Sequence, residues 1–307
     1  MIEFPDKISI FSQPEHVRQF AQEGYVIVPF LTTEQIEELT VLYKKFYPKG
    51  VDGFFTTTFA NNVDHREQVN QSIARVCTPR IQEIFEEYKI LFSSFIVKAP
   101  GPKSELIMHQ DMTLVDESNY SGINIWCPLI DLTDTNGAIE VLPKSHRLFK
   151  TYRGSSIPDI YDNVVSELKT IMVPLHLKAG EAVIFDQSII HYSPPNLSDT
   201  ERPVINTFVA HPDARIKICH WDKDKEPDRV EIFEQEDDFL EKFENFGHNI
   251  FDRPTIGKSL GFFPYDFPKL TVEMIEEEYD IKLIKSDSSE SSKPSFFKRL
   301  FTKKKKA

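Results

Sequence analysis

The sequence is poor in glycine and cysteine. Its 307 residues include 11 glycines and three cysteines, Cys77, Cys127 and Cys219. Neither of the glycine-rich phosphate loops GxGxxG and GxxxxGK[ST] occurs, so no such nucleotide-binding loop is present. The cysteines are widely spaced and form no CxxC pair, which excludes a structural zinc knuckle and gives no reason to expect a disulfide framework.

Long apolar runs are also missing. No stretch approaches the roughly 18 apolar residues of a membrane span. The N-terminal residues 1–11 lack the basic segment and long apolar run of a secretory signal. Together with the unpaired cysteines, these absences predict a reducing, cytoplasmic location.

The net charge of −12 conceals two regions of opposite sign. Lysine and arginine number 36 against 48 acidic residues, but residues 291–307 contain seven cations and no acid, which leaves −19 on residues 1–290. A nucleic-acid groove needs clustered cations, so this acidic body argues against one. Residues 286–295 are serine-rich and are expected to form a flexible linker.

The basic tail, residues 296–307, is amphipathic if helical, because Phe297, Leu300 and Phe301 then lie on one side. Residues 296–306 are predicted to make peripheral contact with an anionic membrane surface. A solubilising tail, or a tail that docks on the acidic body, remains the alternative.

Two kinds of pattern divide the rest of the chain. The N-terminal part, residues 14–91, and the C-terminal part, residues 226–280, have apolar residues at helical spacing, with helices expected over 226–247 and 271–279. Residues 92–221 instead contain short apolar runs between turn residues, typical of a sandwich or barrel. These runs are 92–99, 105–111, 122–129, 138–142, 170–177, 182–186, 189–192, 204–211 and 215–221. We expect a mainly β fold with flanking helices in one domain, residues 1–285.

Shorter signals add detail to this outline. Gly24 is expected to end a helix that opens at Pro14, a strand follows over 24–28, and Thr32 resembles a helix N-cap. Residues 143–169 form a longer insertion that we expect to be partly helical.

A metal-ligand pattern lies within the strand region. In a strand, His109 and Asp111 would project from the same face. His191, at the end of another predicted strand, is the best candidate for a third ligand. Two histidines and one carboxylate on one face of Fe(II) leave three positions open, enough for a bidentate 2-oxo acid and O2. Arg202 offers a permanently charged fork for the distal carboxylate of such an acid.

These residues lie within a longer resemblance. The stretch from Met108 to Phe208 resembles the phytanoyl-CoA dioxygenase family of Fe(II)- and 2-oxoglutarate-dependent oxygenases, and the similarity extends over about residues 15–212. The matching phrases are FAQEGYVIV at 20–28, MHQD at 108–111, IWCPLIDLTDTNG at 125–137, VLPKSH at 141–146, AGEAVIFD at 179–186, and His191 followed by Arg202. One departure is Lys144, where the family usually has glycine in a turn.

The resemblance implies a double-stranded β-helix, the jelly-roll or cupin-like barrel. It assigns the iron ligands, and hence the catalytic centre, to His109, Asp111 and His191, and the contact to the 2-oxoglutarate C5 carboxylate to Arg202. It further implies that Lys98, Asn124 or Thr207 lines the co-substrate pocket.

The implied reaction is hydroxylation of a C–H bond in a small or lipid-like substrate, with release of succinate and CO2. Because Asp111 is present, the halogenase variants of the fold, which lack this carboxylate, are disfavoured. The sequence leaves open the substrate and whether the protein is a monomer or a dimer.

Two other functions remain open. One is a cupin-like metal enzyme that uses no 2-oxo acid, against which Arg202 argues. The other is a catalytically silent adaptor that works through its basic tail; liposome binding without substrate-stimulated succinate formation would favour it. Trp126 either borders the pocket or fills the barrel, and His146 is interpreted as a turn residue.

Overall fold

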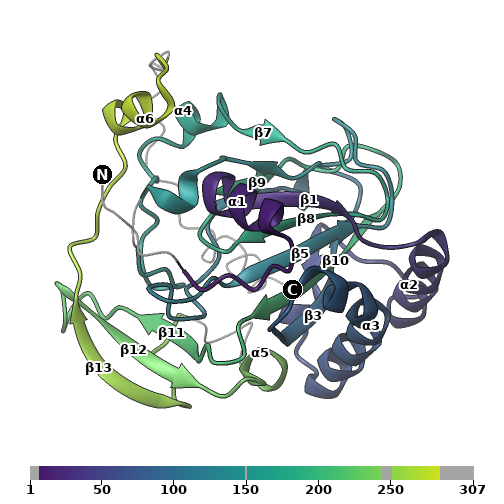
Figure 1. Ribbon diagram of the computed structural model, residues 1–307, viewed down its shortest axis with the longest axis horizontal. Coiled ribbons are helices and arrows are strands. Elements are labelled where there is room, and N and C mark those ends of the chain that lie inside the picture. The colour runs from purple at the N-terminus through teal and green to yellow at the C-terminus, as the bar shows by residue number, and fades with distance from the viewer. Residues whose placement is uncertain (1–6, 149–150, 244–250, 284–307) are drawn as a thin grey trace.

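Two antiparallel sheets form the centre of the molecule (Figure 1). The computed structural model describes residues 7–148, 151–243 and 251–283. The larger sheet has the order β1 (Tyr25–Pro29), β8 (Glu181–Asp186), β5 (Ile123–Pro128), β10 (Arg202–Ala210), β3 (Lys89–Lys98) and β2 (Phe54–Thr56). The smaller sheet has the order β4 (Leu106–His109), β9 (His191–Ser193), β6 (Glu140–Val141) and β7 (Val173–Pro174).

The two sheets pack face to face through one apolar cluster. Trp126, Val183 and Val204 of the larger sheet contact Val141 of β6 and Ile189 just before β9. Every residue of β5 is buried, because its second face is covered as well. Such strands read as continuous apolar runs, which is why the sequence pattern located them. The mainly β, jelly-roll architecture expected from the sequence is confirmed.

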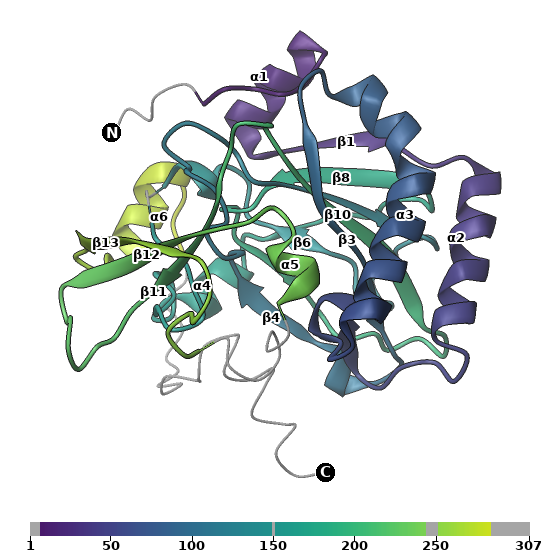
Figure 2. The ribbon, with the colours of Figure 1, turned by 90° about the horizontal axis from the view of Figure 1, so that it is seen from below.

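Helices cover the outer face of the larger sheet (Figures 1 and 2). They are α1 (Pro14–Glu23), α2 (Thr33–Phe46) and α3 (Val63–Ile84). Gly24 ends α1 with φ +84°, and Thr32 and Gln35 form a reciprocal capping box at the start of α2. Both predicted helix boundaries are therefore confirmed. Within the described residues no helix is both long and apolar enough to cross a membrane.

The short elements lie in the connections. They are the 3-10 turns η1 (Thr57–Phe59), η2 (Pro102–Ser104) and η3 (Ser145–Arg147), and the helix α4 (Val165–Lys169). Together η3 and α4 make the insertion partly helical, as expected. Lys144 has φ +67°, in the left-handed region that favours glycine. The departure from the family pattern therefore falls at a turn whose backbone still has the glycine conformation.

The C-terminal part corrects one prediction. Residues 226–247 were expected to be helical, but β12 (Arg229–Gln235) pairs with β11 (Ile216–His220) and β13 (Lys258–Pro264) in a third sheet. Residues 230–233 are all buried, so both faces of β12 are covered, and its apolar residues do not mark a single helix face.

In the described C-terminal part, two short helices lie before and after β13. They are α5 (Phe239–Lys242) and α6 (Val272–Tyr279), and α6 matches the helix predicted over 271–279. The predicted linker and basic tail, residues 286–307, lie outside the described residues, so their roles stay predictions.

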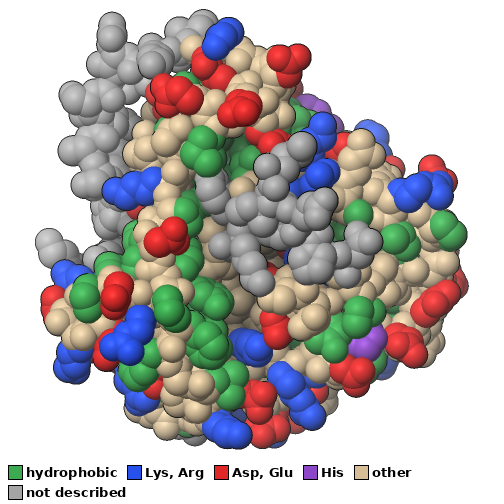
Figure 3. Space-filling model, turned by 60° about the vertical axis from the view of Figure 1, so that its left-hand side comes forward, with side chains coloured by type: hydrophobic (Ala, Val, Ile, Leu, Met, Phe, Trp, Pro, Cys, Tyr) green, Lys and Arg blue, Asp and Glu red, His purple; other side chains and the backbone are tan. Residues whose placement is uncertain are grey.

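Strand β13 is an edge of the third sheet and exposes apolar side chains. Leu260, Phe262 and Phe263 are between 37% and 45% exposed. Figure 3 brings this side of the molecule forward and shows hydrophobic side chains gathered among charged ones. This sheet lies at the periphery and does not line the cavity described below.

A buried carboxylate shapes the turn between β8 and β9. One oxygen of Asp186 accepts hydrogen bonds from the Ser188 backbone N–H and hydroxyl at 2.9 and 2.6 Å, and the other accepts from Lys7 Nζ at 3.1 Å and from Ser121 at 2.9 Å. Burial opposes ionisation, but Lys7, His146 and Ser188 together hold the pKa of Asp186 well below its usual range.

This depressed pKa predicts a pH-dependent contribution to stability. Because the folded-state pKa lies below the unfolded value of about 3.9, the stabilisation is complete above about pH 5 and is lost as the pH falls below 4. Asp186→Asn should lower the free energy of unfolding by about 2 kcal/mol at pH 7 and flatten its dependence on pH. Urea unfolding at several pH values between 3 and 7 measures this.

The control is Asp134→Asn, since the Asp134 side chain is 88% exposed and paired with His176 at the surface. Its effect should stay within about 0.5 kcal/mol. Equal pH profiles for wild type and Asp186→Asn would contradict the assignment.

Candidate metal centre and cavity

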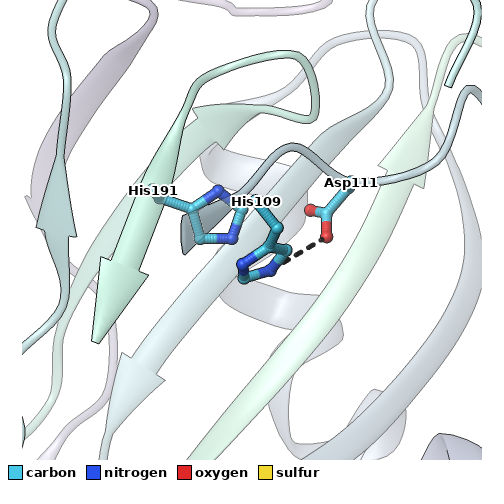
Figure 4. A group of neighbouring side chains, drawn as sticks. All are labelled: His109, Asp111 and His191. Carbon is cyan, nitrogen blue, oxygen red and sulfur yellow. Dashed lines mark ion pairs between the residues drawn. The ribbon is translucent and has the colours of Figure 1, made fainter. Parts of the chain in front are cut away.

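His109, Asp111 and His191 come together between the two sheets (Figure 4). One nitrogen or carboxylate oxygen from each lies within 4.8 Å of those of the other two. His109 Nε2 is 3.8 Å from Asp111 Oδ1, and the two imidazole centroids are 4.0 Å apart. The juxtaposition expected from the sequence is present.

Asp111 lies outside strand β4, which corrects the expectation that it projects from the same strand face as His109. Strand β4 ends at His109, which pairs with His191 of β9 across the antiparallel ladder. Asp111 follows in a loop, where its backbone N–H donates to Gln187 O at 3.0 Å. The carboxylate therefore reaches the histidines from a loop and not from the same strand face.

Both imidazoles have one nitrogen held by backbone. Nδ1 of His109 is 2.8 Å from Ile107 O, and Nδ1 of His191 is 3.0 Å from Ile189 O. A carbonyl only accepts hydrogen bonds, so each Nδ1 carries the proton and each Nε2 presents a lone pair. Metal-binding histidines are oriented by this kind of contact.

The electrostatics of the cluster favour a bound cation. Burial, followed by repulsion from His191, lowers the pKa of His109 well below its usual value, so the imidazole is neutral. Burial raises the pKa of Asp111, while His191, Arg153 and a hydrogen bond from Asn124 at 2.6 Å oppose that rise. Two imidazoles whose Nδ1–H groups are held by backbone carbonyls and a nearby carboxylate are a donor set that fits a divalent transition metal.

The cluster borders an elongated cavity between the sheets. Its wall is lined by residues from both sheets and from the loops at their ends: Phe54, Thr56, Thr58, Phe59, Phe92, Ser94, Ile96, Leu106, His109, Asp111, Met112, Leu114, Asn124, Trp126, Ile139, Phe185, Gln187, His191, Ser193, Arg202, Asn206, Phe208 and Leu240. Arg202 is the only lysine or arginine among these described lining residues.

The character of the cavity changes along β10. Arg202, Asn206 and Phe208 all face inward, and at about 3.3 Å per residue Arg202 and Phe208 lie about 20 Å apart along the strand. Asn206 donates to Asn124 Oδ1 at 3.0 Å, which places a polar belt beside Asp111. The far end is apolar, where Phe208 packs with Phe92, Leu114 and Leu240, and with Phe59 and Met112 at its margin. The cavity thus has a cationic end, a polar middle and an apolar end.

Arg202 is buried at the cationic end without an acidic partner. Nη1 donates to Gly137 O at 3.0 Å, and the guanidinium lies 5.1 Å from the Trp126 ring centroid. Nε has no hydrogen-bond partner, and no ion pair with a carboxylate is formed among the described residues. Burial lowers the pKa of Arg202 to about 9. A buried, incompletely satisfied guanidinium is a suitable site for an anion.

Lys98 lies opposite Arg202 in the ladder but does not line the cavity. Its amine donates to Ser193 O at 2.7 Å and Pro194 O at 2.5 Å, which fixes the chain just after His191. Burial, then repulsion from Arg202, lowers the pKa of Lys98 to about 5. Lys98 therefore supports the wall of the cavity from behind and does not line it, although the sequence interpretation had expected it to do so.

Thr207 corrects a second expectation. Its side chain points to the opposite face of β10, where the hydroxyl lies 3.0 Å from Ser93 Oγ. The β10 residues that line the cavity are Arg202, Asn206 and Phe208, which alternate with Thr207, so Asn206 takes the place that the sequence interpretation gave to Thr207. Asn124, in contrast, lines the cavity as expected.

The structure decides between the two interpretations of Trp126 and places His146. Trp126 borders the cavity. His146 lies outside it, with Nε2 3.2 Å from Ala21 O in the η3 turn, as its interpretation as a turn residue predicts. The sequence interpretation missed Asn206 and Arg153. Strand alternation counted from Arg202 would have located Asn206, but nothing in the sequence indicates Arg153.

Comparison with known proteins adds a family match. The model of the family described as phytanoyl-CoA dioxygenase (PhyH) matches residues 8–204. Phytanoyl-CoA dioxygenase 1 of Oryza sativa subsp. japonica is 31% identical over 138 residues, 44% of this chain and 47% of the relative. Phytanoyl-CoA dioxygenase domain-containing protein 1 of Danio rerio is 27% identical over 159 residues, 47% of this chain and 55% of the relative. The chain spans about half the length of these curated relatives.

Comparison with solved structures gives matches at lower identity. EvdO2 from Micromonospora carbonacea var. aurantiaca, complexed with 2-oxoglutarate, is 18% identical with a TM-score of 0.47, over 67% of this chain and 93% of that chain. HygX from Streptomyces hygroscopicus, with nickel and 2-oxoglutarate bound, is 11% identical with a TM-score of 0.48, over 66% and 87%. The family match covers the three clustered side chains and Arg202.

Proposed function

Since the chain belongs to the phytanoyl-CoA dioxygenase family, we propose that it is a non-haem Fe(II)- and 2-oxoglutarate-dependent dioxygenase. It hydroxylates a C–H bond of a small or lipid-like substrate and releases succinate and CO2. One observation carries the proposal: the cluster of His109, Asp111 and His191 opens into a cavity that ends at the buried guanidinium of Arg202.

His109 and His191 would hold Fe(II) through Nε2, and Asp111 through a carboxylate oxygen. Their Nδ1–H groups donate to backbone carbonyls, which sets the tautomer that has its lone pair on Nε2. Three ligands from the protein leave positions for 2-oxoglutarate and O2. Bound iron supplies the activation of O2 and the oxidising power for the C–H bond.

Arg202 would bind the C5 carboxylate of 2-oxoglutarate. The guanidinium is buried, its contact to Gly137 O fixes its plane, and Nε has no hydrogen-bond partner. A carboxylate here would supply the charge partner that the described residues do not, and would favour the charged form of Arg202. Trp126 packs against the guanidinium and restricts its movement.

The apolar end of the cavity would bind the substrate. Phe92, Leu114, Phe208 and Leu240 form a wall without charge, so an alkyl or ring group fits there. No lysine or arginine other than Arg202 lines the cavity in the described residues, so the phosphates of a CoA ester would have to lie outside it. The same apolar wall excludes water from the reacting carbon.

Arg202 and the His109, Asp111 and His191 cluster also bear on the two alternative functions. A cupin-like enzyme that uses no 2-oxo acid has no need of a buried guanidinium without an acidic partner. A silent adaptor has no need of two buried imidazoles, each with Nδ1–H held by a backbone carbonyl, beside a carboxylate. Both alternatives are therefore disfavoured by the same cavity.

The ligand set predicts the effect of removing each ligand. His109→Ala, Asp111→Ala and His191→Ala should each raise the Kd for Fe(II), titrated without oxygen, by more than about 100-fold, since even indirect supports of metal ligands are worth about 10- to 100-fold. His211→Ala is the matched control, because His211 is buried against Glu87 and does not line the cavity. Wild-type affinity in any of the three ligand variants would refute that ligand.

The role of Arg202 predicts a selective loss of co-substrate affinity. Arg202→Met should raise the KM for 2-oxoglutarate by about 10- to 150-fold, as expected for losing about 1.5–3 kcal/mol of hydrogen bonding to a charged group. The Kd for Fe(II) should stay unchanged. Succinate formation at varied 2-oxoglutarate concentrations measures the KM.

Thr207→Val provides the control on the same strand. It keeps the side-chain shape, loses the contact to Ser93 and should leave this KM unchanged. A normal KM in Arg202→Met, or a raised one in Thr207→Val, would count against the assignment.

A further inference from the structure

A second loop holds the backbone of Asp111. Arg153, in the insertion that follows β6, donates from Nε to Asp111 O at 2.7 Å. Thr113 N donates to Arg153 O at 3.0 Å, and Arg153 N donates to Thr113 Oγ1 at 3.0 Å. The loop after β4 and the loop after β6 are therefore joined by three hydrogen bonds beside the metal cluster.

Arg153 is itself held by a buried acid. Nη1 donates to Glu117 Oε2 at 2.9 Å, and Nη2 donates to Glu117 Oε1, so the pair is bidentate. The side chains of Arg153 and Glu117 are only 8% and 10% exposed. A bidentate pair in this geometry fixes the plane of the guanidinium. The direction of its Nε–H toward Asp111 is fixed with it.

Asp111 depends on these contacts because no strand ladder holds it. Its N–H donates to Gln187 O, its carbonyl accepts from Arg153, and its carboxylate accepts from Asn124. Asn124 lies in β5 and Gln187 in the turn directly after β8, whereas Arg153 comes from a loop insertion. The arginine thus completes a three-point hold on the one clustered residue that lies outside a strand.

We propose that Arg153, fixed by Glu117, is a positioning residue that sets the affinity of the His109, Asp111 and His191 cluster for a divalent metal ion. This inference rests on the proposed metal-binding function but goes beyond it, since Arg153 is not one of the three clustered side chains and does not line the cavity. It acts through the main chain of Asp111 and so on the direction of its carboxylate.

If Arg153 only stabilised the fold, its removal would lower stability without changing metal affinity. A second ion pair, away from the cavity, serves as the control for that case. Arg253 donates from Nε and Nη2 to Glu231 at 2.7 and 2.6 Å, and Glu231 is 4% exposed. This pair lies at the third sheet and lines no part of the cavity. Removing it should lower stability without changing metal affinity.

The experiment compares Arg153→Lys, Arg153→Met, Glu117→Gln and Arg253→Met in the full-length protein. Co(II), whose visible absorption reports on ligand geometry, is titrated into each metal-free protein, and the Tm of each is recorded without metal. We expect Arg153→Lys and Arg153→Met to raise the Kd for Co(II) by about 10- to 100-fold and to change the Co(II) band. Glu117→Gln should also raise the Kd for Co(II) and change the Co(II) band.

Arg253→Met should lower the Tm and leave the Kd within about twofold of the wild type. Arg153→Lys keeps the charge, so it serves if Arg153→Met does not fold. An unchanged Kd in folded Arg153→Lys would overturn the inference while leaving the proposed function intact. A wild-type protein that fails to bind Co(II) or Fe(II) would overturn the proposed function as well.

Discussion

The pairing of β4 with β9 is the constraint on which the site depends. This antiparallel pair sets His109 opposite His191, although the two residues are far apart in sequence. The carbonyl of Ile107 in β4 and that of Ile189, just before β9, fix the imidazole tautomers. The ladder and these carbonyls therefore fix both the separation and the tautomers of the two imidazoles, and the loop after β4 adds the carboxylate of Asp111.

Separation of buried charge is the second constraint. The acid of the site, Asp111, lies beside the polar belt, while Arg202 lies at the cationic end of the cavity with no carboxylate paired to it in the described part of the chain. Burial of unpaired charge is unfavourable, and both Arg202 and Lys98 have lowered pKa values as a result. A co-substrate carboxylate at Arg202 would supply the charge partner that its burial lacks.

Much of the fold and of the candidate site could be predicted from the sequence, since short stretches of residues carry the pattern. Buried strands appear as apolar runs, and the spacing of His109, Asp111, His191 and Arg202 matches a family pattern. Thr207 was misplaced because strand alternation had not been counted from Arg202, and residues 229–235 were misassigned because so short an apolar pattern fits either period.

The hold of Arg153 and Glu117 on Asp111 could not be predicted at all. It joins two irregular loops, and neither its residue types nor their spacing indicate that these loops meet. Contacts of this kind follow from the path of loops over a barrel, which no periodic pattern encodes.

The central claim is that one cavity binds Fe(II) and 2-oxoglutarate together. Its most direct test is anaerobic addition of 2-oxoglutarate to the Fe(II)-loaded protein, followed by visible absorption. Chelation of the iron by the 2-oxo acid should produce a metal-to-ligand charge-transfer band that saturates with 2-oxoglutarate and is absent when succinate is added instead. A protein that binds Fe(II) but develops no such band at saturating 2-oxoglutarate would contradict the account.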